Sequence, residues 1–299
     1  MSDQNTASNC SIEKKGNLRA IFYNVYGYDN DEKHDGKRGG PLALRHAMQV
    51  EIFENYAPDV MGFQEYVNVS HSILTPKLAE IGYAEVPSTR PAGDRVNDTP
   101  IFYKESTLEL KASGYHLFNE KVDGIDASCN NDFTKSLSWA VFEKKADAKQ
   151  FIFVSTHLMY TADRSNGVAY ERARSANVDE LFAIVDDIKK EYPTLPVIVG
   201  GDLNCYPNGM AFVKMQTRFK WMQEAEGVSA DTCGFKNYST YSYEKKEYTV
   251  CPMPPETGYG IDHAFYSGNI DVINYRTLTD RASLLASDHC PKLADIVLH

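Results

Sequence analysis

The chain has 299 residues, of which 42% are hydrophobic and 24% are charged, a composition that excludes a mainly disordered, collagen-like or coiled-coil protein. Acidic residues outnumber basic ones by 41 to 31, which gives a formal net charge of −10 at pH 7. A broad basic surface for polyanions is therefore not expected, and some of the surplus carboxylates are candidate metal ligands.

Strand-like and helical patterns alternate along the chain. The predicted elements, in chain order, are a strand over 18–26, a helix over 41–56, a strand over 59–65, a helix over 70–81 with Ser70 as its cap, strands over 101–104, 108–118, 137–143 and 151–158, a helix over 168–190, and strands over 196–202, 261–266, 270–278 and 292–298. The segments 28–40 and 114–135 read as surface insertions, and 222–256 as a polar loop region. Because strands far outnumber helices, the pattern favours two packed sheets flanked by helices in one domain.

The termini and cysteines give no sign of export or of a membrane anchor. The polar N-terminus lacks the apolar core of a signal peptide, and no stretch approaches the ~18 apolar residues of a membrane span. We therefore expect a monomeric cytoplasmic protein, with residues 1–17 as a disordered lead-in and residues 18–299 as a single domain.

None of the six cysteines forms a C-x-x-C pair, so a structural zinc site is not expected. Reduced thiols are the default, although Cys233 and Cys251 could bridge one loop region.

Polar side chains of a similar kind stand at the ends of several predicted strands. In chain order they are Asn24, Glu65, His157, Asp202 with Asn204, Asp262, and Asp288 with His289 just before the last strand. A strand that ends in such a residue delivers the side chain to the rim of its sheet, and several rims can converge on one cleft. Taken singly, many of these residues have ordinary roles as caps or turn formers, but the repeated pattern favours a shared site.

The residue types in this set point to phosphate ester chemistry. Carboxylate and amide oxygens suit a hard cation such as Mg²⁺ or Mn²⁺. Histidine paired with aspartate can act as a base or contact a phosphate. The sequence has neither a nucleophile elbow nor a Gly-rich P-loop. The chemistry that the set supports is metal-assisted attack of water on a phosphate ester.

The sequence also resembles the endonuclease/exonuclease/phosphatase superfamily. The matching blocks are AIFYNVYG, PDVMGFQE, TPIFYK, FVSTHL, VIVGGDLN, GIDHAF and SDHCPKLADI, which occur in the family's order over residues 19–297. The resemblance implies an α+β fold, a four-layer α/β/β/α sandwich of two packed, mostly antiparallel sheets flanked by helices. It also implies one active site at the sheet rim.

The resemblance assigns three residues to a divalent metal ion, Mg²⁺ or Mn²⁺. Glu65 would be the main ligand, with Asn24 beside it. Asp288 would complete the metal environment, through water or a second ion.

The resemblance assigns catalytic roles to five other residues. Asp202 would orient or deprotonate the attacking water, and Asn204 would hold a phosphate oxygen or the metal-bound water. Asp262 would pair with His289 and fix its tautomer, as carboxylates behind a functional histidine do. His289 would contact the scissile phosphate, and His157 would contact it from the other side.

One familiar feature of the family is altered in this chain. Many members place a Glu shortly before the strand at 101–104, where it supports the His of the S-x-H-L block. Here the candidates are Asn97 and Asp98, so the support of His157 stays open.

The core residues point to a bond type and leave the substrate open. We expect hydrolysis by in-line attack of an activated water, first of all by a nuclease or nucleotide phosphodiesterase acting on a nucleic acid end, a nucleotide or a small phosphoester. An inositol-phosphate or lipid-head-group phosphatase is the alternative, and a non-catalytic phosphate-binding relative is less favoured. Lys135 falls in or near a likely rim loop and could contact a phosphate, although a solvated surface charge is the simpler interpretation. Tyr206 lies close to a motif block and could stack on a base or sugar, although packing is the simpler account.

Overall fold

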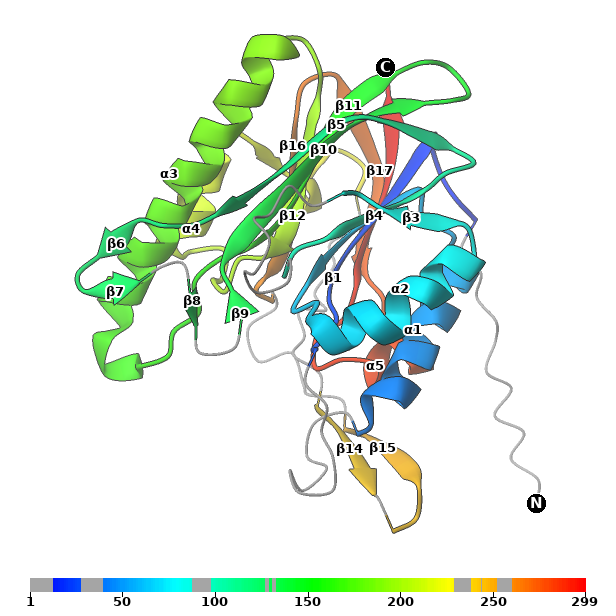
Figure 1. Ribbon diagram of the computed structural model, residues 1–299. Coiled ribbons are helices and arrows are strands. Elements are labelled where there is room, and N and C mark those ends of the chain that lie inside the picture. Colours follow the sequence, from blue (N-terminus) through cyan, green and yellow to red (C-terminus); the bar gives the residue numbers. More distant parts are fainter. Residues whose placement is uncertain are drawn as a thin grey trace.

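Two six-stranded sheets pack face to face in a computed structural model, with helices on their outer sides (Figure 1). The structure describes residues 13–27, 40–87, 98–126, 129–130, 133–228, 238–242, 244–251 and 260–299. The two packed sheets and the helices on their outer sides confirm the expected four-layer α/β/β/α sandwich of the α+β class. Within the described residues, no helix is long and apolar enough to cross a membrane.

The first sheet has the strand order β17-β18-β1-β2-β4-β3. Its strands are β1 (Leu18–Asn24), β2 (Val60–Gln64), β3 (Tyr83–Glu85), β4 (Ile101–Lys104), β17 (Ile270–Thr277) and β18 (Lys292–Leu298). Only β1 and β2 are parallel, and all other neighbours are antiparallel. Because Asn24 pairs with Gln64 at the ends of the parallel strands, Glu65 emerges beside Asn24 at the same edge.

The second sheet has the order β13-β16-β12-β11-β10-β5 and again contains one parallel pair, β11 with β12. Its strands are β5 (Leu108–Leu117), β10 (Ser136–Lys144), β11 (Gln150–His157), β12 (Val197–Asp202), β13 (Lys220–Trp221) and β16 (Asp262–Ser267). The register pairs His157 with Asp202 and Asp202 with Asp262. Three polar side chains therefore stand in one row across the end of this sheet.

Apolar side chains fill the space between the sheets and under the helices. Phe22 of β1 stacks on Phe153 of β11 with ring centroids 4.9 Å apart, at the centre of the core between the sheets. The outer faces are covered by α1 (Leu42–Tyr56) and α2 (Asn68–Glu80) on the first sheet and by α3 (Gly167–Glu191) and α4 (Met210–Gln216) on the second. This packing fixes both sheets relative to each other, and with them the strand ends.

Several local predictions differ from the structure. The helix α2 begins at Asn68, its N-cap is Val67, and Ser70 is buried inside it, so the predicted Ser70 cap is wrong. The short helices α4 and α5 (Arg281–Leu285) and the hairpin of β14 (Tyr238–Ser242) and β15 (Glu247–Cys251) were not predicted. Each of the missed helices has seven residues or fewer, which is too short for a clear helical period.

The predicted insertions and lead-in are described only in part. Residues 1–12 and 28–39 lie outside the described residues, whereas Asn17 hydrogen-bonds to both Ile296 and Leu298 of β18. The chain therefore joins the first sheet one residue before the predicted strand. The segment 114–135 begins as the end of β5 and continues with the short strands β6 (Lys121–Val122), β7 (Ile125–Asp126), β8 (Cys129–Asn130) and β9 (Phe133–Thr134). A Cys233–Cys251 bridge falls outside the side chains that the structure describes.

Candidate active site

The polar residues predicted from the strand ends meet at one edge of the sandwich, which we call the polar rim. The set comprises Asn24, Glu65, His157, Asp202, Asn204, Asp262, Asp288 and His289. Asp262 comes from the beginning of β16, because this strand is antiparallel to β12 and starts at the edge where β12 ends. The sandwich thus gathers in one place residues that are up to 265 positions apart in the sequence.

Asp202 occupies the centre of the rim and is 2% exposed. Its Oδ1 accepts a hydrogen bond from the Asn204 backbone N–H at 2.8 Å, and its Oδ2 accepts one from Asn24 Nδ2 at 3.1 Å. The preceding Gly201 has φ +141°, and a Cβ there would lie 2.0 Å from the carbonyl oxygen of Thr156. The second glycine of the GGD sequence thus lets β12 pass close to β11, which positions the carboxylate rather than simply forming a turn.

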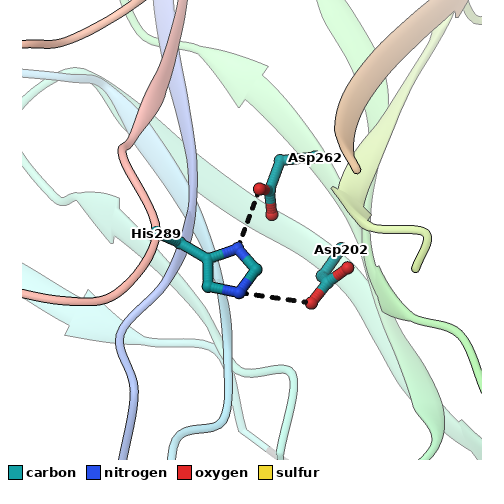
Figure 2. A group of neighbouring side chains, drawn as sticks. All are labelled: Asp202, Asp262 and His289. Atoms are coloured by element: carbon teal, nitrogen blue, oxygen red, sulfur yellow. Dashed lines mark hydrogen bonds and ion pairs between the residues drawn. The ribbon is translucent and has the colours of Figure 1, made fainter. Parts of the chain in front are cut away.

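His289 and Asp262 form a buried pair next to this carboxylate. His289 Nδ1 lies 2.8 Å from Asp262 Oδ2, and His289 Nε2 lies 3.9 Å from Asp202 Oδ2. Figure 2 shows the imidazole between the two carboxylates. Burial alone would lower the pKa of the imidazole, but the carboxylates of Asp262, Asp288 and Asp202 raise this pKa to about 10. The raised pKa favours the imidazolium form of His289, in which one N–H is held by Asp262 and the other is directed into the site.

His157 stands on the opposite side of Asp202, with its Nε2 3.6 Å from Asp202 Oδ2. Its Nδ1 donates to Asp98 Oδ2 at 2.8 Å, so Asp98 supports the ring, whereas Asn97 lies outside the described residues. Lys135 Nζ lies 2.6 Å from Nε2 and donates to it. This contact places the imidazole proton on Nδ1, since a nitrogen that accepts a hydrogen bond carries no proton.

Lys135 lies at the polar rim, as its position in a likely rim loop allowed, but it is buried there. The interpretation as a solvated surface charge is wrong, because Lys135 is only 1% exposed and contacts His157. Its position carried a usable signal. It directly precedes β10, whose first residue, Ser136, pairs with His157. A lysine just before a strand that begins at the rim is therefore delivered into the site.

The acidic side of the rim is formed by Glu65 and Asp288. Burial and the nearby charge of Asp288 raise the pKa of the Glu65 carboxyl above its usual range. Glu65 Oε2, Asp288 Oδ1 and Asp262 Oδ1 are buried, and none has a hydrogen-bond donor within the described part of the chain. Buried carboxylate oxygens without donors are costly, and a hard cation satisfies such oxygens well. Asp202, Asp262 and His289 also place ligand atoms within 4.8 Å of one another, a second arrangement that could hold an ion.

His263 follows Asp262 on β16 but belongs to the core under α4. Its ring packs against Phe212 with centroids 4.8 Å apart, and its Nε2 donates to the Cys205 carbonyl oxygen at 3.0 Å. Burial lowers the pKa of His263 to about 3. Its role is structural, and its lowered pKa contrasts with the raised pKa of His289 at the rim.

The lowered pKa of His263 makes the fold sensitive to acid. An unfolded chain takes up a proton on this histidine near pH 6.5, whereas the folded protein does so only near pH 3, so stability falls as pH falls between these values. The wild-type protein should lose free energy of unfolding between pH 7.5 and pH 5, and His263 should account for about 2 kcal/mol of that loss. Replacing His263 by Gln, which keeps a donor for the Cys205 carbonyl oxygen, should remove this part of the loss. Urea unfolding of both proteins at these two pH values measures this, and an equal loss in both would contradict it.

Comparison with known proteins assigns the chain to a family. Residues 21–289 match the profile of the Endonuclease/Exonuclease/phosphatase family. An endonuclease/exonuclease/phosphatase from Bacteroides vulgatus is 22% identical, with a TM-score of 0.70 over 95% of this chain and 100% of that chain. A mannosyl-6-phosphatase from Bacteroides thetaiotaomicron is 18% identical, with a TM-score of 0.67 over 94% and 100%. The catalytic domain of human Nocturnin is 18% identical, with a TM-score of 0.63 over 96% of both chains.

At these identities the solved structures show the shared fold, and no curated protein matches the sequence. The family profile covers all of the polar rim from Asn24 to His289. The chain belongs to the endonuclease/exonuclease/phosphatase family, whose members hydrolyse phosphate esters.

Proposed function

We propose that the protein is a divalent-metal-dependent phosphoesterase that works by in-line attack of an activated water. The observation that carries this proposal is the arrangement around Asp202. This carboxylate is held by two N–H donors between two histidines and lies beside buried carboxylate oxygens that have no donor within the described residues. A base, an imidazolium and a place for a hard cation are the groups that hydrolysis of a phosphate ester needs.

Glu65, Asp288 and Asn24 are the residues that would hold the cation, Mg²⁺ or Mn²⁺. Glu65 Oε2 and Asp288 Oδ1 are buried acidic oxygens without a donor among the described residues, and Asn24 Oδ1 accepts the Tyr26 backbone N–H at 3.0 Å. The alternative ligand group of Asp202, Asp262 and His289 is less suitable, because Asp202 already accepts from Asn24 and Asn204, and Asp262 Oδ2 is already paired with His289 Nδ1. A bound cation would stabilise the negative charge of a phosphate oxygen and favour loss of a proton from the attacking water.

The protein groups would divide the remaining chemistry. Asp202 accepts the proton of the attacking water, and the N–H groups of Asn24 and Asn204 hold its carboxylate in place. His289 donates its Nε2–H to a phosphate oxygen as negative charge develops there, while Asp262 keeps the ring charged and oriented. His157 would contact the phosphate from the opposite side once its Nε2, which accepts from Lys135 here, is protonated. Asn204 would contact a phosphate oxygen by turning its Nδ2 away from the Leu158 carbonyl oxygen, to which it donates here at 3.0 Å.

The metal requirement can be tested on simple substrates. The chelated protein should release little p-nitrophenol from p-nitrophenyl phosphate or its bis ester, and Mg²⁺ or Mn²⁺ should restore the release. Changing Glu65 to Gln should raise the Mg²⁺ concentration for half-maximal activity at least ~10-fold, because a neutral amide is a weaker ligand. Glu143→Gln, at the far end of β10, is the matched control and should leave the titration unchanged. An unchanged titration in Glu65→Gln would remove this residue from the metal site, and release without metal dependence would contradict the proposal.

For the substrate, we propose a nucleic acid end or a nucleotide first. Tyr206 follows Asn204 by two residues, and 51% of its surface is exposed. An exposed tyrosine ring two residues after Asn204 offers a platform on which a base can stack. A screen of short single-stranded RNA and DNA, dinucleotides and nucleotides tests this assignment, with inositol phosphates and lipid phosphoesters as the competing classes.

A phosphomonoester is the second candidate, and Lys135 favours it. A monoester carries close to two negative charges at neutral pH, one more than a diester, and a buried lysine beside His157 offers a further positive charge. The related fold of a mannosyl-6-phosphatase is consistent with this candidate. Changing Lys135 to Met should then lower kcat/KM for p-nitrophenyl phosphate about 10-fold more than for the bis ester. Equal losses on both substrates would exclude a monoester-specific role.

A further inference from the structure

Arg45 of α1 is a wholly buried arginine whose guanidinium binds the backbone next to the polar rim. Its Nη1 donates to the carbonyl oxygen of Tyr26 at 2.6 Å and lies 3.4 Å from that of Val25. Its Nε donates to the carbonyl oxygen of Gly40 at 3.3 Å. Arg45 thus holds the segment that directly follows Asn24 at the end of β1.

Gln49, one turn further along α1, joins this segment to the one that carries Asp288. Its Nε2 donates to the carbonyl oxygens of Val25 and Ala286, each at 3.0 Å. Ser287 completes the connection, because its Oγ donates to the carbonyl oxygen of Asn24 at 2.6 Å. One face of α1 therefore ties together the two chain segments from which Asn24 and Asp288 reach the rim.

The charge of Arg45 also fits this location. Burial lowers the pKa of its guanidinium, and the neighbouring side chains of Tyr248 and Asp288 act in the opposite direction. Arg45 is therefore a buried cation close to the acidic side of the rim. Lysine could supply the charge but not the planar fork, which reaches several carbonyl oxygens at once.

We propose that Arg45 is a positioning residue that, together with Gln49, sets the affinity of the rim for its divalent cation. This inference rests on the metal site proposed above, in which Asn24 and Asp288 are ligands. Arg45 does not touch the reacting groups. It acts through the backbone of residues 25–26, and Gln49 through the backbone of Val25 and Ala286.

A direct measurement of metal binding tests the proposal without relying on turnover. Titration of the full chain with Mn²⁺, followed by the electron paramagnetic resonance signal of the free ion, gives the dissociation constant. Arg45→Lys should raise this constant at least ~10-fold, as the loss of residues that orient metal ligands does, and Gln49→Met should raise it in the same direction. At saturating Mn²⁺, kcat should recover toward the wild-type value, because the reacting groups are intact.

Arg19→Lys is the matched control for the loss of a buried arginine. Arg19 also donates to a backbone carbonyl, that of Tyr56 at 2.8 Å, but it lies at the other end of β1, about 17 Å along the strand from Asn24. This variant should lose thermal stability and keep the wild-type affinity for Mn²⁺.

The possible results distinguish a failure of the role of Arg45 from a failure of the proposed metal-dependent function. Wild-type affinity in Arg45→Lys overturns the role of Arg45, and if that variant does not fold, wild-type affinity in Gln49→Met overturns it instead. An equal loss of affinity in Arg19→Lys also overturns it, because the effect would then follow general destabilisation. A wild-type protein that binds no Mn²⁺ contradicts the proposed metal-dependent function itself.

Discussion

Replacing Asp202 by asparagine should lower kcat by about 10³- to 10⁴-fold while the protein stays folded. An amide cannot accept the proton of the attacking water at neutral pH. Its oxygen can still accept the Asn204 N–H that now lies 2.8 Å from Oδ1, so that contact survives. The bond from Asn24 Nδ2 is lost, which costs about 1 kcal/mol of stability. Steady-state kinetics at saturating Mg²⁺, together with the thermal midpoint, separate the two effects.

Asp295→Asn is the matched control for this substitution. Asp295 is fully buried and accepts hydrogen bonds from Arg19 at 2.6 and 3.0 Å, on a strand that runs away from the polar rim. Loss of this ion pair should destabilise the fold more than Asp202→Asn and leave kcat unchanged. A near-native kcat in Asp202→Asn would show that another group activates the water.

The candidate site could be predicted from the sequence because polar residues interrupt buried strands at their ends. Asn24, His157 and Asp202 are the last residues of β1, β11 and β12, as their positions after apolar runs indicated. What the sequence alone does not contain is the register between strands. The pairing of Asp202 with Asp262 depends on an antiparallel neighbour, and only the folded sheet shows that both lie at one edge.

The residues behind this set were harder to predict, because their role depends on burial. Lysine and arginine are almost always exposed, so a surface charge was the simpler interpretation of Lys135, and nothing in the sequence singled out Arg45, although both side chains are buried. Asn97 and Asp98 are adjacent and both polar, and the choice of Asp98 as the support of His157 follows from a contact between segments 59 residues apart. Long-range contacts of this kind leave no local pattern.

The missed elements have a related cause. The helix α5 has five residues and is stabilised by its cap, in which the Asp280 side chain accepts the Ser283 backbone N–H at 3.1 Å. A single capping residue before so short a segment is a weak signal. By contrast, α3 spans 25 residues and buries Leu181, Val185 and Ile188 at helical spacing, and a helix over 168–190 was predicted from the sequence.

Removing the His289 side chain should lower kcat by about 10³-fold, since the imidazolium next to Asp202 would no longer stabilise the developing charge. Asp262→Asn should cost about 10- to 100-fold, because Asp262 acts on the reaction through His289 Nδ1 at 2.8 Å. Without the carboxylate, the pKa of His289 falls from about 10, and the alkaline limb of the kcat profile should move to lower pH.

The double variant decides whether the two residues work as a unit. If Asp262 acts only through His289, His289→Ala with Asp262→Asn should be no slower than His289→Ala alone, a strong departure from additivity. The control is His263→Gln, which alters the residue next to Asp262 but belongs to the core around Phe212, and it should keep the native kcat. Additive losses in the double variant would instead give Asp262 a direct part in the reaction, for which its unpaired Oδ1 is the available atom among the described groups.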